Sequence, residues 1–188
     1  MQEFAGKVAV ITGGASGVGR SLSFALGRRG ARVVAADVDR KAMDALERDA
    51  AGAGISLLTR RCDVTAAADC EALAEFASGE HGRIDLVFAN AGIGAGEAGP
   101  MWTYSVKDWQ WCLGVNVWGV VNTINAFMPR LVAQDNPALR AVLEAIGSGA
   151  FSFGEAQRYK ALVDDLLNVD RYFLLADFAD YCDAQARI

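Results

Sequence analysis

Short apolar runs alternate with longer stretches of helical periodicity over the first 90 residues of the chain. Runs of this kind are typical of strands buried on both faces, and the stretches between them are long enough for right-handed crossover helices. The predicted strands are residues 7–12, 31–37, 55–60 and 84–90, and the predicted helices are residues 17–30, 40–52 and 66–82. The pattern therefore predicts an α/β fold, a doubly wound parallel sheet of the Rossmann type.

The pattern changes after the fourth predicted strand. Residues 105–134 form one long helical stretch with apolar positions on more than one face, which predicts burial by the sheet and by a second subunit. The residues that follow are helical in pattern and lack a further β-rich run, apart from the ambiguous segment 171–177. We expect an incomplete sheet with strand order 3-2-1-4 in residues 1–134, followed by a helical segment in residues 135–188.

A glycine-rich segment, TGGASGVG at residues 12–19, joins the first predicted strand to the first predicted helix. Such a turn lets the backbone pass close to a pyrophosphate, and the helix N-terminus offers N–H groups and a positive dipole end. Its spacing differs from the general dinucleotide fingerprint but serves the same purpose. Taken alone, these glycines are equally well explained as a tight structural turn.

Polar residues at the ends of the other predicted strands favour a ligand site. Asp37 ends the second strand, where its carboxylate can accept hydrogen bonds from the hydroxyls of an adenine ribose and repel a 2′-phosphate. Cys62-Asp63-Val64 follow the third strand, and Asn90-Ala91-Gly92 follow the fourth, at the edge where open α/β sheets bind ligands. Taken alone, Asp37 is explained as a solvent-exposed carboxylate in a turn, and Asp63 as the N-cap of a helix. Together these positions predict an NAD site.

The phosphate-binding loop of a nucleotide triphosphatase is the rival interpretation of the same glycines. The segment 14–21 imitates that motif, but Arg20 stands where the motif has the lysine that contacts the β- and γ-phosphates. The fourth predicted strand also ends at Asn90 instead of a magnesium-binding aspartate. Both differences disfavour the rival.

Composition and charge narrow the range of partners. The 188 residues carry a net charge of −5 at pH 7, and the lysines and arginines are scattered, so no basic surface for nucleic acid or an anionic membrane is expected. No apolar run reaches the roughly 18 residues of a membrane span, and no signal peptide is recognisable, so we expect a cytoplasmic protein. Cys62, Cys70, Cys112, Cys182 and His81 lack metal-ligand spacing, which predicts reduced, buried thiols and no metal.

Residues 1 to about 134 resemble the short-chain dehydrogenase/reductase family. The shared motifs occur in the family's order: TGGASGVG, Asp37, CDV at 62–64, NAG at 90–92, and Asn116 in GVNVWGV. The resemblance implies an NAD-dependent oxidoreductase that moves a hydride between its dinucleotide and a small alcohol or ketone, with Asn116 as one member of an Asn-Ser-Tyr-Lys catalytic set. It also implies a set of cofactor-binding residues: Thr12, Gly13, Ser16, Gly17, Val18, Gly19, Asp37, Asp63, Val64, Asn90, Ala91 and Gly92.

The rest of that catalytic set is not recognisable in this sequence. The family places a serine at the end of a fifth strand and Tyr-x-x-x-Lys on the next helix, where residues four apart share one face. Tyr159 and Lys160 are adjacent, so on a helix they would point about 100° apart. Ser148 and Ser152 lie in a glycine-rich stretch more typical of a loop. We therefore expect impaired catalysis, and an inactive nucleotide-binding module is the alternative.

The end of the chain has a resemblance of its own. Residues from about 135 to 188 are similar to part of the C-terminal region of glycogen/α-glucan phosphorylases, a family whose cofactor lysine and phosphate ligands lie upstream of that region. No phosphorylase activity is implied. Our hypothesis is a chimeric chain with its junction within about residues 134–138, which associates as a homo-oligomer through the helix at 105–134. A non-functional fusion is a further alternative.

Overall fold

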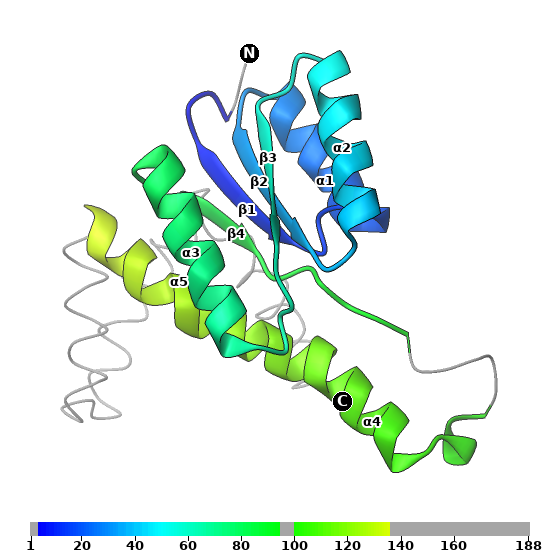
Figure 1. Cartoon of the computed structure of the whole chain (residues 1–188). Helices are drawn as coiled ribbons and strands as arrows, with labels where there is room; N and C mark the ends of the chain where they lie inside the picture. The colour runs from blue at the N-terminus through cyan, green and yellow to red at the C-terminus, as the bar shows by residue number, and fades with distance from the viewer. Residues whose placement is uncertain (1–3, 95–99, 136–188) are drawn as a thin grey trace, which may run out of the picture. The chain divides into compact units, whose positions relative to one another are not determined.

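The computed structural model describes residues 4–94 and 100–135 (Figure 1). The chain divides into two compact units, Met1–Met128 and Pro129–Ile188. The sheet and the site described below belong to the first unit. Residues 136–138 of the predicted junction lie outside the described residues, as do Ser148, Ser152, Tyr159, Lys160 and Cys182.

Four parallel strands form one sheet in the order β3-β2-β1-β4, which confirms the predicted order. The strands are β1 (Val8–Thr12), β2 (Arg32–Asp37), β3 (Leu57–Arg61) and β4 (Leu86–Phe88). Every residue of β1 is buried, because elements cover both faces of the sheet, and this explains its unbroken apolar sequence. In the register Thr12 pairs with Ala36 and Asp37 with Arg61, so the strand ends meet along one edge.

The helices that connect the strands cover both faces of the sheet. α1 (Gly17–Arg28) and α2 (Arg40–Gly52) lie on one face, and α3 (Ala67–His81) lies on the other (Figure 1). Met43 and Leu46 of α2 are fully buried in the core between α2 and the sheet. The Asp39 carboxylate caps α2 by accepting hydrogen bonds from the N–H groups of Lys41 and Ala42 at 2.9 and 3.1 Å.

β4 is shorter than the predicted strand at 84–90. It ends at Phe88 because the next loop bonds to β1 through side chains, with the Asn90 N–H donating to Thr12 Oγ1 at 3.0 Å. An apolar pattern indicates which residues are buried, whether they lie in a strand or in a loop. The loop residues on either side of β4 are buried or half-buried as well, so they extend the apolar pattern beyond the strand. The sequence pattern therefore overestimated the length of β4.

The helix predicted at 105–134 is present with an interruption. α4 (Val106–Leu113) begins at a capping box formed by Ser105 and Asp108, and a π-helical turn, η2 (Gly114–Trp118), leads into α5 (Gly119–Asp135). At Gly119 an added Cβ would lie 2.6 Å from Val64 Cγ2, so α5 begins in close contact with the loop after β3. The apolar periodicity continues through the π turn, so the pattern does not reveal it.

α4, η2 and the start of α5 expose several large apolar side chains. Trp111, Leu113, Val117, Trp118 and Ile124 are each between 46% and 60% exposed. This exposure is what a helix that associates with another subunit would show. The predicted homo-oligomer through this helix stays a prediction.

Candidate functional site

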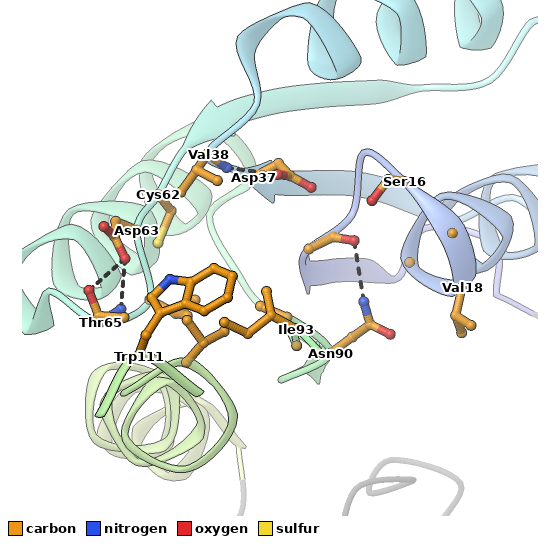
Figure 2. Close-up of a pocket in the computed structure, with 17 residues that line it drawn as sticks. Ser16, Val18, Asp37, Val38, Cys62, Asp63, Thr65, Asn90, Ile93 and Trp111 are labelled. Atoms are coloured by element: carbon orange, nitrogen blue, oxygen red, sulfur yellow. Dashed lines mark hydrogen bonds between the residues drawn. The ribbon is translucent and has the colours of Figure 1, made fainter. Parts of the chain in front are cut away.

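A cavity of about 560 Å³ lies at the edge of the sheet where the strands end (Figure 2). Its volume is within the range of sites that hold small molecules and cofactors. The loops after all four strands, the first turn of α1 and one face of α4 and η2 line it: Gly13, Ser16, Gly17, Val18, Gly19, Asp37, Val38, Cys62, Asp63, Val64, Thr65, Asn90, Ala91, Gly92, Ile93, Trp111 and Val115. The structure thus brings together all predicted cofactor-binding residues except Thr12.

Thr12 lies under the cavity and holds two of its loops together. Its buried hydroxyl accepts hydrogen bonds from the N–H groups of Asn90 and Ala91 at 3.0 and 3.1 Å and donates to the Phe88 carbonyl at 3.3 Å. The Asn90 side chain in turn donates to the carbonyls of Thr12 and Gly13 at 2.9 and 3.3 Å. These bonds fix the glycine turn against the loop after β4.

The glycine turn, residues 12–19, has a shape that larger residues would disturb. Gly17 opens α1 with φ +48°, and a Cβ built there meets no atom within 4 Å. At Gly19 a Cβ would collide with the Gly13 carbonyl oxygen and lie 2.6 Å from Asn90 Nδ2. Ser16 is the N-cap of α1, but its side chain makes no capping hydrogen bond among the described residues. The turn therefore leaves room for a phosphate beside the N–H groups of the first helical turn.

The Asp37 carboxylate is held by three backbone N–H groups. Oδ1 accepts from Val38 and Asp39 at 2.8 and 3.2 Å, and Oδ2 accepts from Ala15 at 3.1 Å. These bonds join the end of β2 to the glycine turn and fix the orientation of the side chain. A carboxylate fixed in this way can accept hydrogen bonds from ribose hydroxyls and repels an added phosphate.

The loop after β3 forms the cavity wall beyond Asp37. The Asp63 carboxylate accepts hydrogen bonds from the Thr65 N–H at 3.0 Å and from the Thr65 hydroxyl at 2.7 Å. It does not cap α3, whose N-cap is Ala66, so the helix-cap explanation of Asp63 was wrong. Two effects raise the pKa of the Cys62 thiol well above its usual range. The larger is its side-chain hydrogen bond with Cys70, and the second is its burial. Cys62 is therefore a neutral group in this wall.

Asn116 lies in the π turn and is not among the residues that line the cavity in the described part of the chain. Its side chain bonds twice to Ile93, with Oδ1 accepting from the N–H and Nδ2 donating to the carbonyl, both at 2.9 Å. The Asn116 side chain thus ties the loop after β4 to the helix. Its membership in a catalytic set stays a prediction.

Sequence reasoning missed several of the cavity residues. Val38, Thr65 and Ile93 are next to predicted residues, so extending each strand-end segment by one position would have found them. Trp111 and Val115 are four positions apart on one helix face. No signal in the pattern of strands and helices indicates that this face turns toward the end of the sheet, because tertiary packing decides it.

Arg20, which stands where a triphosphatase loop has its lysine, is not among the residues that line the cavity. Its guanidinium bonds to the Asp49 carboxylate on α2 at 2.7 Å and lies 4.9 Å from the centre of the Phe24 ring. It is thus engaged with neighbouring helix residues.

Three further features concern the described residues alone. In 4–94 and 100–135, no helix combines the length and the apolar character that crossing a membrane requires. Within the same ranges, no cluster of three or more His, Cys, Asp or Glu side chains is arranged to hold a metal ion. Cys62, Cys70 and Cys112 are buried and form no disulfide.

Comparison with protein families gives two overlapping matches. The model for short chain dehydrogenases matches residues 7–141, and the model for carbohydrate phosphorylases matches residues 106–188. Both therefore match residues 106–141. This overlap gives the chimera hypothesis only weak support.

The curated relatives include dehydrogenases and oxidoreductases. The 1-deoxy-11-beta-hydroxypentalenate dehydrogenase of Streptomyces exfoliatus is 36% identical over 155 residues, which cover 78% of this chain and 56% of the relative. The C alpha-dehydrogenase of a Sphingobium species is 30% identical over 154 residues, covering 78% of this chain and 48% of the relative. The chain spans about half the length of these relatives. Both alignments cover more of the chain than residues 1–134 contain, so the similarity continues past the predicted junction.

Solved structures show the same fold with a bound dinucleotide. A short chain dehydrogenase/reductase from Burkholderia phymatum in complex with NAD has a TM-score of 0.67 and 41% identity, covering 72% of this chain and 48% of that one. A metagenomic short-chain oxidoreductase in complex with NADP has a TM-score of 0.64 and 33% identity, covering 69% of this chain and 58% of that one. The sheet order, the glycine turn and these matches agree, and the chain belongs to the short-chain dehydrogenase family.

Proposed function

We propose that this chain binds NAD(H) in the cavity at the end of the sheet, with the pyrophosphate at the glycine turn and the adenine ribose at Asp37. The observation that carries the proposal is the Asp37 carboxylate, which is fixed by three N–H groups and lines the same cavity as the turn. The strand order places the loop after β3 on one side of Asp37 and the loop after β4 on the other. The adenine then lies toward Asp63 and Val64, and the nicotinamide toward Asn90–Gly92.

The residues present fit such a cofactor. The glycine turn offers backbone donors without side chains in the way, and the ribose position offers an acceptor of fixed orientation. The bound dinucleotide would supply the hydride chemistry, while the chain binds and orients it. Solved relatives hold NAD in one case and NADP in another, so the preference for NAD rests on Asp37.

The first test replaces Asp37 with alanine. We expect NADH affinity to fall by at least about tenfold, since ribose hydrogen bonds to a charged acceptor are worth about 1.5–3 kcal/mol. NADPH affinity should change less or improve, because the carboxylate that repels the 2′-phosphate is gone. Isothermal titration of both nucleotides into both proteins measures the ratio of their affinities.

Asp39→Ala is the matched control for this variant. Asp39 is an aspartate two residues further along, it caps α2, and it is not among the cavity residues. Its loss should cost about 1 kcal/mol of stability and leave the NADH/NADPH ratio unchanged. A wild-type chain that binds NADPH as tightly as NADH, with no effect of Asp37→Ala on the ratio, would refute the assignment of Asp37.

We infer further that any hydride transfer between this cofactor and a small alcohol or ketone is impaired. The sequence contains no Tyr-x-x-x-Lys, and Tyr159 and Lys160 are adjacent. A positioned acid or base at the substrate oxygen contributes about 10²–10⁴-fold, so turnover should be lower by about that factor than in a short-chain dehydrogenase with the full set. The absorbance of NADH, followed with panels of ketones and alcohols, measures this. Turnover at the level of such an enzyme would contradict the inference.

An inactive nucleotide-binding module is therefore the second candidate function. A composite chain, in which residues 135–188 are a phosphorylase-like segment without phosphorylase activity, has only the weak support of the match of residues 106–188 to carbohydrate phosphorylases, which overlaps the dehydrogenase match. A cytoplasmic location and association through the helix at 105–134 belong to the same proposal. Thermal melting with and without NADH separates a binding module from a fusion that binds nothing, because a ligand that binds the folded state raises its stability.

A further inference from the structure

Trp111 is a large aromatic side chain on the wall of the cavity. It comes from α4, lines the cavity and is 55% exposed. Figure 2 shows its indole extending from the helix into the space between Asp63 and Ile93. A tryptophan that remains this exposed is not packed in the core of its unit. Its ring faces the cavity instead.

The helical segment formed by α4, η2 and α5, which carries Trp111 in α4, is fixed to the cavity from two sides. Asn116 binds the Ile93 backbone twice, and Asn122 Nδ2 donates to the carbonyls of Val64 and Thr65 at 2.9 and 3.3 Å. These bonds attach the helix to the loop after β4 and to the loop after β3. The position of the indole relative to both loops is therefore set by the fold.

The part of the cavity that Trp111 faces is suited to a flat aromatic group. Its other lining residues include Val64, Ile93 and Val115, with the neutral thiol of Cys62. It lies between the loop after β3, which holds Cys62 and Val64, and Ile93 of the loop after β4, and the strand order puts the β3 loop next to Asp37, where the proposed ribose lies. A purine between these residues would have the indole as its only aromatic neighbour among the lining residues of the described chain.

We propose that the indole of Trp111 forms an aromatic wall of the adenine subsite and adds affinity for adenine nucleotides by contact with the purine ring. The inference rests on the proposed function, since it places the adenine end of the cofactor. Contact between a base and an aromatic side chain typically changes affinity by about tenfold or more. The chain should accordingly bind AMP, which lacks the nicotinamide half, and Trp111 should contribute to that binding.

The test compares Trp111→Leu, Trp111→Phe and Trp102→Leu in the full chain. Trp102 is the matched control, because it lies in η1 (Met101–Thr103), is 83% exposed and is not a cavity residue. Titration with AMP and with NADH should show about tenfold weaker binding of both to Trp111→Leu. Trp111→Phe should retain most of the affinity, because a phenyl ring keeps an aromatic surface, and Trp102→Leu should match the wild type.

Tryptophan fluorescence gives a second readout that does not depend on the leucine variant. AMP should shift the emission of the wild type and of Trp102→Leu, because the purine shields the indole of Trp111 from water, and it should leave the emission of Trp111→Phe unshifted. Two results would overturn the inference: an AMP affinity of Trp111→Leu equal to that of the wild type, or an AMP-induced emission shift that persists in Trp111→Phe. Neither result would contradict the proposed binding of NADH by the wild type. A wild type that binds neither nucleotide would instead overturn the proposed function together with the inference.

Discussion

Replacing Gly19 with alanine is expected to weaken NADH binding by more than about 100-fold, a loss of about 3 kcal/mol. Even the single added carbon would collide with the Gly13 carbonyl oxygen and lie 2.6 Å from Asn90 Nδ2. Both neighbours are held in place, since Asn90 bonds to Thr12 and Gly13 and the hydroxyl of Thr12 bonds back to Asn90. The turn must open to accept the methyl group, which moves the backbone that would contact the pyrophosphate. Calorimetric titration with NADH measures the effect.

Gly79→Ala is the matched control for Gly19→Ala. Gly79 is an exposed glycine within α3, and a Cβ built there meets no atom within 4 Å. Alanine at this position should raise stability by about 0.5–1 kcal/mol and leave NADH affinity at the wild-type value. If Gly19→Ala binds NADH as tightly as Gly79→Ala does, the glycine turn is not the cofactor site.

Replacing Asp85 with alanine is expected to lower the free energy of unfolding by about 3 kcal/mol. The side chain is 3% exposed and lies just before β4, where Oδ2 accepts a hydrogen bond from the Val8 N–H of β1 at 2.9 Å. Arg83 donates to the carboxylate at 2.7 and 3.0 Å, and Lys7 Nζ lies 3.6 Å away. Replacing Asp85 removes the carboxylate that the buried Val8 N–H, the Arg83 guanidinium and the Lys7 ammonium contact. Urea denaturation measures the loss.

The stability supplied by Asp85 should also depend on pH. Burial acts to raise the pKa of this carboxyl, but the Val8 N–H, the Arg83 guanidinium and the Lys7 ammonium outweigh it, so the pKa lies below the usual 3.8. Because the pKa is lower in the folded state, the stabilisation is present above pH 3.8 and is lost as the pH falls through the folded-state value. Asp85→Ala should therefore lose less stability than the wild type on acidification below pH 3.8.

Asp44→Ala is the control for Asp85→Ala. Asp44 forms an exposed ion pair with Arg40 at 3.0 Å on α2, and such pairs contribute about 0.3–0.5 kcal/mol. Equal losses of stability in the two variants would show that the buried contacts of Asp85 do not hold β1 and β4 together. NADH affinity should be unchanged in both variants, because neither aspartate lines the cavity.

The parts of the fold that the sequence predicts are those set by local pattern. The apolar run of β1 requires burial on both faces, and the glycines after it require an open turn, so the sheet order and the glycine turn could both be anticipated. Asp37 was placed at the cavity because a strand end in a parallel sheet always faces the same edge. The Ala15 N–H was not foreseeable as a partner of this carboxylate, since Ala15 approaches only when β1 and β2 pair.

The features that the sequence did not predict depend on contacts between distant segments. The π turn at η2 does not disturb the apolar pattern, and it accompanies side-chain bonds from Asn116 to Ile93, 23 residues earlier. Trp111 looks like any exposed helix residue until the helix is attached to the loops after β3 and β4. The part of the cavity formed by the strand ends was therefore predicted, while its helical wall was not.

A calorimetric titration of NADH into the full wild-type chain tests most directly whether the glycine turn and Asp37 form a dinucleotide site. We expect saturable binding with one NADH per chain, a higher melting temperature with NADH, and clearly weaker binding of NADPH. A folded chain that releases no heat with NADH and gains no thermal stability from it would show that these residues do not form such a site.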